Sequence, residues 1–400
     1  MRHALRSLQH RNFRLFYVGQ LVSLSGTWMQ SLAQAWLLYR LTGSGFMLGL
    51  ASAASLLPSL VFGLYGGILA DRFSRQRLLI AAQTLAMVQA LVLAGLTLSG
   101  VVAPWHILTL AVLLGIVQAI ELPARHSFVA GLVPREDLAN AIALNASLFH
   151  ASRLVGPAIA GVLVALIGEG WVFLLNGLTF IAVLAVLMAI RLPRAEGAVA
   201  PTAQGLHAGL SYARRHAPVR AALGMVAAVS LLGSAAGVLL PVFAVQVFDV
   251  GAQRLGLLMG AIGAGALAGA FLLAGRRDPA GLERVIAISG VGVGSALALF
   301  AATPSFLVAL PLLALVGFCI TSVNASSNAF IQLAVPDNLR GRVMSIYSVA
   351  LHGMVPIGSL VAGAGADAIG PAFTVGAFGL ALATLALFMG RPLRSPPVPG

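Results

Sequence analysis

Gly67-Ile-Leu-Ala-Asp-Arg-Phe-Ser-Arg-Gln-Arg77 is a short charged turn between two long stretches without charge, residues 45–66 and 78–103. Each stretch is long enough to cross a bilayer as a helix, which takes about 20 residues. A turn so rich in arginine is typical of the cytoplasmic side of a membrane. Small residues before Asp71 let two helices approach closely, and Asp71 can cap the next helix or pair with an arginine. The turn therefore predicts two membrane spans joined in the cytoplasm.

The composition excludes an ordinary soluble fold. Of the 400 residues, 59% are hydrophobic and 9% are charged, whereas a soluble domain carries about 25% charged residues. The net charge of +13 is placed at the ends of apolar stretches rather than in one patch, which argues against a nucleic-acid partner. The single cysteine, Cys319, cannot form an intrachain disulfide, and we expect neither a metal site nor a cofactor.

The apolar stretches predict an all-α, polytopic membrane protein with twelve spans. These are expected at residues 13–39, 45–70, 77–99, 105–125, 139–167, 170–191, 218–247, 252–274, 282–303, 305–329, 341–368 and 371–390. An even number of spans places both termini on one side. Arginines concentrate on that side, which predicts that both termini are cytoplasmic.

The chain is expected to divide into two similar halves. Residues 1–191 form the first six-helix bundle, 192–217 a cytoplasmic linker with an amphipathic helix, 218–390 the second bundle and 391–400 a cytoplasmic tail. An offset of 202 residues carries Val133-Pro134 onto Val335-Pro336, His150 onto His352, and Ile167-Gly168 onto Ile369-Gly370. The same offset carries Asp71 onto Leu273, so a gate built on Asp71 should work mainly from the first half.

Polar side chains inside the spans are costly to bury in lipid, and each is a candidate for function. In the first span, polar residues spaced 3, 4, 3, 4 lie on one helical face: Gln20, Ser23, Thr27, Gln30 and Gln34. We expect this stripe to line a water-filled cavity; the alternative is hydrogen bonding between helices.

Four further spans hold candidates. Glu121 in the fourth span can pair with Arg125 one turn on, or can load and release a proton. In the fifth span Arg153 is a candidate for binding an anionic substrate group or for partnering Glu121, and Asn145 is a candidate for the cavity.

His150 and its repeat equivalent His352 are candidates for coupling protons, because histidine titrates nearest neutral pH. The alternative for each is a neutral ring bonded to a nearby helix. Asn324 and Asn328, one turn apart in the tenth span, are candidates for lining the cavity.

The pattern G-x-L-A-D-R-x-x-R-x-R resembles the signature between the second and third spans of the major facilitator superfamily, with Gly67, Asp71, Arg72 and Arg75 at its positions. The Gly156-Pro157 segment resembles in part a motif of the superfamily's exporters. The stretches 132–138 (Leu-Val-Pro-Arg-Glu-Asp-Leu) and 335–342 (Val-Pro-Asp-Asn-Leu-Arg-Gly-Arg) look like the branch that contains bacterial enterobactin exporters and macrolide efflux proteins.

The resemblance implies two pseudo-symmetric six-helix bundles in one polypeptide that exports a small amphiphilic molecule by rocking its halves, as a proton antiporter. The expected partners are that molecule, protons and the lipid bilayer, and the expected state is a monomer. Asp71, Arg72 and Arg75 would form a cytoplasmic gate. An importer or lysophospholipid flippase of the same fold, or a receptor that does not transport, stays open. An enzyme is not expected, because the sequence holds no recognisable reaction centre.

Overall fold

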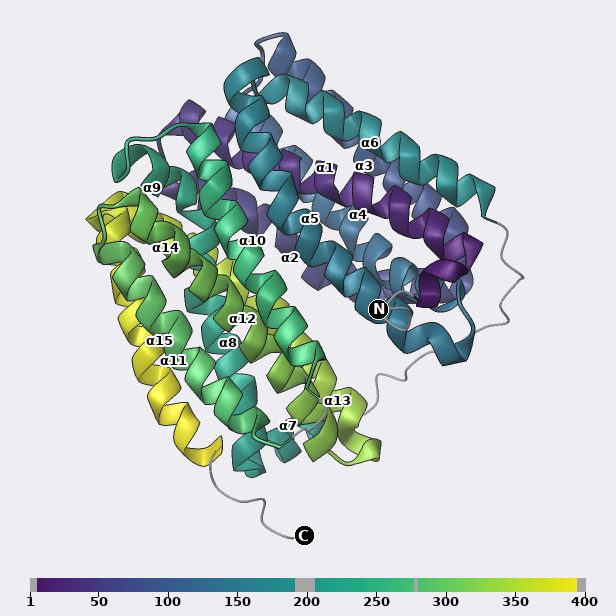
Figure 1. Ribbon diagram of the computed structural model, residues 1–400, viewed down its shortest axis with the longest axis vertical. Helices are drawn as coiled ribbons and strands as arrows, with labels where there is room; N and C mark the ends of the chain where they lie inside the picture. Colours follow the sequence, from purple (N-terminus) through teal and green to yellow (C-terminus); the bar gives the residue numbers. More distant parts are fainter. Residues whose placement is uncertain (1–5, 191–205, 277–279, 394–400) are drawn as a thin grey trace. The chain divides into compact units, whose positions relative to one another are not determined.

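The computed structural model describes residues 6–190, 206–276 and 280–393, without the side chains of residues 64–72, 206–208 and 393. Throughout this part of the chain the secondary structure is helical and includes no strand. Contacts divide the chain into two compact units (Figure 1). Unit 1 holds Met1–Gly43, Ala54–Pro201 and Val250–Gly260, and unit 2 holds Ser44–Ala53, Thr202–Asp249 and Ala261–Gly400.

Unit 1 is built from five complete long helices and two short 3₁₀ helices. These are η1 (Arg6–Gln9), α1 (Arg11–Thr42), α3 (Arg75–Leu98), α4 (Pro104–Ala130), η2 (Arg135–Asp137), α5 (Leu138–Ile167) and α6 (Glu169–Ala189). Helix α1 packs along α5 and α6, and α3 packs along α4 and α6. Phe13, Phe16 and Phe128 are buried in its core, where their apolar surface is removed from lipid and water alike.

Unit 2 repeats this design with α11 packed between α12 and α15, and α8 against α14 and α15. Its complete helices are α7 (Leu206–Arg215), α8 (Ala217–Val238), α9 (Leu240–Gln246), α11 (Leu282–Ala302), α12 (Phe306–Ala334), α13 (Asp337–Ser348), the π-helical η3 (Val349–Gly353), α14 (Met354–Ile369) and α15 (Pro371–Leu393). The remaining helices, α2 (Gly45–Arg72) and α10 (Ala252–Ala274), each contribute residues to both units.

Eleven helical segments of the described chain are long and apolar enough to cross a membrane. Helix α1 is not among them, because its polar stripe and its arginines lower its mean hydropathy, but its 32 residues are long enough to span. The span expected at 218–247 is divided into α8 and α9. Pro241, in the first turn of α9, has no backbone N–H and so cannot continue the helical hydrogen bonds of α8.

The internal repeat is visible in the backbone. Gly168 joins α5 to α6 with φ 83° and ψ 167°, and Gly370 joins α14 to α15 with φ 90° and ψ 152°. Positive φ is readily adopted only by glycine, so the same sharp turn recurs 202 residues later. Pro134 and Pro336 also match, preceding η2 and α13 with extended backbones.

Candidate functional site

The polar stripe of α1 faces the interior of unit 1. Gln20, Ser23 and Gln30 are 2%, 2% and 3% exposed, while Thr27 and Gln34 are partly buried. The Thr27 hydroxyl donates to the Ser23 carbonyl oxygen of its own helix at 3.0 Å. The burial of Gln20, Ser23 and Gln30 agrees with the alternative of hydrogen bonding between helices, and the lining of a cavity by this stripe stays a prediction.

Gln30 joins three helices. Its Nε2 donates to Oε1 of Gln89 on α3 at 3.0 Å, and its Oε1 accepts from Nδ2 of Asn176 on α6 at 2.7 Å. Both partners are buried. Hydrogen bonds between buried amides hold membrane helices together, because each amide would otherwise be unsatisfied in an apolar surrounding. Helices α3 and α6 thus supply amide partners for Gln30 that no spacing rule on α1 reveals.

Glu121 on α4 lies in a small polar cluster. Its Oε1 is 3.5 Å from Nε of Arg125, one turn on, with the two side chains 13% and 11% exposed. The same oxygen accepts from Nε2 of Gln83 on α3 at 3.4 Å. Of the two partners left open by the sequence, Arg125 forms the ion pair that the structure describes. The contribution of Gln83 was not foreseen.

Arg153 on α5 lies against an aromatic wall. Its guanidinium carbon is 5.4 Å from the ring centroid of Trp28 on α1. Trp28 meets Phe149 edge-on at 5.6 Å, and Phe149 meets His150 edge-on at 5.7 Å. No ion pair among the described residues includes Arg153. A guanidinium held over an aromatic face is stabilised by the ring quadrupole and keeps its N–H donors available.

Gly156 determines how closely α5 approaches α1 beside Trp28 and Arg153. A Cβ atom at Gly156 would lie 2.6 Å from the Cβ of Trp28 and 2.8 Å from the carbonyl oxygen of Ser25. A side chain at this position would push α5 away from α1. The Gly156-Pro157 segment noted in the sequence thus sets the α1–α5 distance at the level of the aromatic wall.

The two histidines of the repeat lie in different surroundings. His150 is partly buried on a regular α-helix, and its Nδ1 is buried without a hydrogen-bond partner in the described chain. His352 is exposed and stands in the π-helical segment η3. A π-helical turn holds an extra residue and therefore rotates the next turns of the helix about its axis. The two positions therefore differ in local structure, and a role of either histidine in proton coupling stays a prediction.

On α12, the carbonyl oxygen of Asn324 accepts from the hydroxyl of Tyr347 at 2.9 Å. The side-chain Oδ1 of Asn324 is buried and has no partner among the described residues. Oδ1 of Asn328 accepts from Nε2 of Gln332 at 2.5 Å. Asn145 on α5 is partly buried. A role for Asn145, Asn324 and Asn328 in a cavity stays a prediction.

Most of the charged loop falls outside the described side chains, which leaves out Gly67, Asp71 and Arg72. The backbone of α2 continues through Arg72. Arg75 begins α3, and its Nη1 donates to the carbonyl oxygen of Ser127 on α4 at 3.4 Å.

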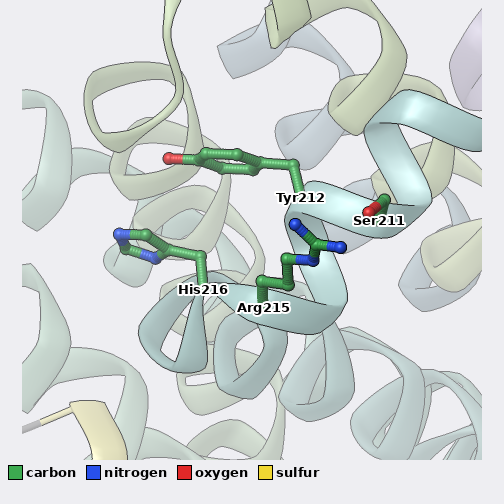
Figure 2. Close-up of a pocket in the computed structure, with 4 residues that line it drawn as sticks. All are labelled: Ser211, Tyr212, Arg215 and His216. Atoms are coloured by element: carbon green, nitrogen blue, oxygen red, sulfur yellow. The ribbon is translucent and has the colours of Figure 1, made fainter.

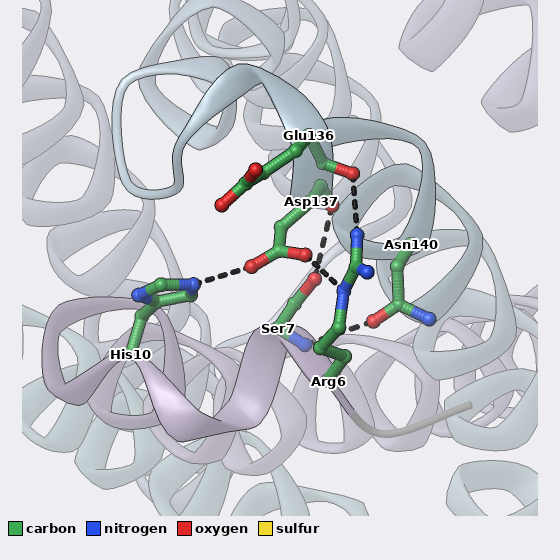
Figure 3. A network of polar contacts seen from close by, with 6 residues as sticks. All are labelled: Arg6, Ser7, His10, Glu136, Asp137 and Asn140. Atoms are coloured by element: carbon green, nitrogen blue, oxygen red, sulfur yellow. Dashed lines mark hydrogen bonds and ion pairs between the residues drawn. The ribbon is translucent and has the colours of Figure 1, made fainter. Parts of the chain in front are cut away.

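A polar network that the sequence did not reveal ties the start of the chain to the α4–α5 connection (Figure 3). The buried carboxylate of Asp137 pairs with Nε of Arg6 and lies 2.6 Å from Nε2 of His10. The Ser7 hydroxyl donates to the Asp137 carbonyl oxygen at 3.0 Å, and the Ser7 N–H donates to Oδ1 of Asn140 at 2.9 Å. These bonds fix η1 against η2 and α5.

Asp367 forms a second unforeseen contact, within unit 2. Its carboxylate accepts from the backbone N–H groups of Gly45 at 2.6 Å and Phe46 at 3.1 Å, and from the hydroxyl of Ser44 at 2.6 Å. Ser44 Oγ in turn accepts from the N–H of Met47 at 3.2 Å. The first N–H groups of a helix have no partner within it, so Asp367 on α14 acts as the cap of α2. The sequence hint was Gly43-Ser44-Gly45, a typical helix start.

Replacing Asp367 with alanine should therefore loosen the start of α2. We expect the free energy of unfolding to fall by about 1 to 2 kcal/mol, the range for a lost cap with a helix-dipole contribution. Thermal unfolding of the detergent-solubilised protein measures it. Glu136→Gln is the matched control, since its carboxylate is exposed and has no described contact. Equal unfolding temperatures for both variants would contradict the capping role.

Two solved transporters have a similar fold. A bacterial homologue of the human lysosomal transporter Spinster, inward-facing and unoccupied, superimposes with a TM-score of 0.72, covering 99% of each chain at 16% identity. A nucleoside transporter gives a TM-score of 0.69, covering 96% of this chain and 100% of the other at 15% identity. The fold is thus that of the major facilitator transporters, which confirms the predicted fold class.

Residues 3–396 match the family described as transmembrane secretion effectors, and the chain belongs to that family of major facilitator transporters. It is 24% identical over 390 residues to the staphyloferrin A transporter of Staphylococcus aureus, covering 95% of this chain and 97% of the relative. It is 24% identical over 370 residues to macrolide efflux protein A of Streptococcus pyogenes, covering 90% of each. The enterobactin exporter of Citrobacter koseri is 24% identical over 401 residues, covering 98% of this chain and 95% of the relative.

Proposed function

We propose that this transporter exports a small amphiphilic molecule across the bacterial inner membrane by alternating access, in exchange for protons. The observation that carries the proposal is Arg153, a guanidinium over the face of Trp28 with no carboxylate paired to it among the described residues. The names of the relatives support export, since they include an enterobactin exporter and a macrolide efflux protein.

The surroundings of Arg153 suit a molecule with an apolar body and an anionic group. Trp28 and Phe149 offer aromatic faces that bind apolar or planar surfaces with little geometric demand. The guanidinium offers a fork of N–H donors that matches a carboxylate or a catecholate oxygen pair. Thr27, Gln34, Asn145, Asn324 and Asn328 would add looser polar contacts in the same cavity.

We assign proton coupling to Glu121, with His150 and His352 as the other candidates. At 3.5 Å its ion pair with Arg125 is long, so the carboxylate can lose this partner without a large rearrangement. Gln83 donates to the ionised form. In this cycle a proton from outside neutralises Glu121 after the substrate has left, and its release into the cytoplasm restores the ion pair.

The remaining elements take the roles that the sequence suggested. The termini lie in the cytoplasm, residues 192–217 link the two six-helix bundles, and a contact made by Gly67, Asp71, Arg72 and Arg75 opens and closes with each cycle. The protein works as a monomer.

Transport by the purified protein in inside-out vesicles tests this function. We expect an anionic aromatic amphiphile, such as a catecholate siderophore, to accumulate when the vesicle interior is acidic and not when the gradient is collapsed. Accumulation only in right-side-out vesicles would indicate an importer or a flippase. Binding without movement in either orientation would indicate a receptor.

Replacing Glu121 with glutamine should abolish the response to the pH gradient while leaving substrate exchange without a gradient intact. The physical reason is that an amide cannot take up and release the coupling proton. The measurement is the ratio of uptake with an imposed pH gradient to uptake without one, which we expect to fall from about tenfold to about one. Glu169→Gln is the matched control, because Glu169 is also a carboxylate paired with an arginine, Arg40, at 3.1 Å. A Glu121→Gln protein that still responds to the gradient would exclude Glu121.

A further inference from the structure

Helix α7 carries a hollow that the transport cycle does not use (Figure 2). The hollow has a volume of about 400 Å³ and is lined by Ser211, Tyr212, Arg215 and His216. Their spacing places Ser211 beside Arg215 and Tyr212 beside His216, each pair one helical turn apart. The rings of Tyr212 and His216 stack at 5.4 Å with an interplanar angle of 14°, and form one wall.

The hollow is held rigidly by unit 2. The hydroxyl of Tyr212 donates to the carbonyl oxygen of Ala334 at the end of α12, at 3.2 Å. A Cβ atom at Gly209 would lie 2.7 Å from the Cβ of Arg342, so α7 lies close against α13. Nη1 of Arg220 donates to the carbonyl oxygen of Arg214 at 2.7 Å and closes the end of α7. The four lining side chains therefore project from a fixed backbone.

Arg215 gives the hollow a positive charge. Arg215 is exposed and takes part in none of the ion pairs that the described residues form. The sequence contains no acidic residue from 197 to 248. Nδ1 of His216 is buried without a described partner.

The position of α7 indicates which class of ligand the hollow could bind. Helix α7 ends at Arg215 and the candidate span α8 begins at Ala217, so α7 lies at the end of a span, where a membrane surface is expected. Leu210 is 38% exposed beside the arginines, the amphipathic pattern of a helix in the interfacial layer. We propose that this hollow binds the phosphate of an anionic headgroup, through the Arg215 guanidinium and the Ser211 hydroxyl.

Native mass spectrometry of the full-length protein tests the site, with three probes: phosphatidylglycerol, phosphatidylcholine and glycerol 3-phosphate. We expect phosphatidylglycerol to be retained most. Arg215→Gln should lower its retention about tenfold, the effect of losing one charge-assisted contact. Arg214→Gln is the matched control, because Arg214 has the same charge and is also exposed but does not line the hollow. Ser211→Leu fills the hollow without removing charge and should have the same effect as Arg215→Gln.

Each outcome decides for or against the site. Loss in Arg215→Gln and Ser211→Leu but not in Arg214→Gln supports a lipid site. Retention of glycerol 3-phosphate with the same dependence on Arg215 supports the phosphate site with a soluble ligand as its source. Equal losses in the Arg214 and Arg215 variants, or equal retention of phosphatidylcholine and phosphatidylglycerol, would overturn the proposal. Because no transport is measured, failure here leaves the export proposal untouched.

Discussion

Replacing Arg153 with glutamine is expected to reduce transport of an anionic amphiphile at least about tenfold, with a smaller change for a neutral amphiphile of similar size. A hydrogen bond to a charged group contributes about 1.5 to 3 kcal/mol, and each 1.4 kcal/mol is a tenfold change. Glutamine keeps a polar side chain but loses the charge and the fork of donors. Initial rates of uptake into inside-out vesicles, measured over a range of both substrates, give the comparison.

The neutral substrate separates loss of recognition from loss of folding. A misfolded Arg153→Gln protein would lose both activities together, whereas loss of an anion-binding group affects only one. Arg14→Gln serves as a second control, because Arg14 is an exposed arginine of α1 with no described side-chain contact. Equal effects of Arg153→Gln on the two substrates would remove Arg153 from the substrate site.

Replacing Gly265 with alanine should destabilise unit 2 severely, although alanine is the better helix former by about 1 kcal/mol. A Cβ atom at Gly265 would lie 1.7 Å from the carbonyl oxygen of Ala314 and 2.9 Å from the backbone nitrogen of Phe318. Backbone atoms cannot rotate away, so α10 and α12 must separate. We expect a loss of about 3 kcal/mol, the upper part of the range for overpacking. Thermal unfolding in detergent measures it.

Gly237→Ala is the matched control for this substitution. Gly237 is also helical and lies in unit 2, but a Cβ atom there would meet nothing within 4 Å. It should leave the unfolding temperature unchanged or raise it slightly. If Gly265→Ala unfolds at the same temperature as Gly237→Ala, then the close approach of α10 and α12 does not limit stability.

The expected spans and the observed helices agree closely because lipid imposes one solution. A backbone in hydrocarbon must satisfy its own hydrogen bonds, so an apolar stretch of span length becomes a helix whatever its neighbours are. The spans expected at 45–70, 139–167 and 252–274 correspond to α2 (Gly45–Arg72), α5 (Leu138–Ile167) and α10 (Ala252–Ala274). The break at Pro241 was overlooked because hydropathy does not register a missing N–H.

The candidate site was harder to predict, as α1 illustrates. A spacing rule finds which residues share a face but not what that face meets. For Gln30 the sequence left cavity lining and interhelical bonding both open, and it could not identify the partners Gln89 and Asn176, which lie 59 and 146 residues further along the chain. In contrast, the pairing of Glu121 with Arg125 was visible in the sequence, because both residues lie on one helix.

By itself, the sequence determined where the apolar helices lie along the chain and the internal repeat, since these depend on local hydropathy and on glycine and proline at turns. Only the tertiary structure decided which polar groups meet: the aromatic wall beside Arg153, the cap that Asp367 places on α2 and the network around Asp137. The physical reason is one of range. Backbone hydrogen bonding in a helix reaches four residues, whereas a side-chain contact depends on how whole helices pack.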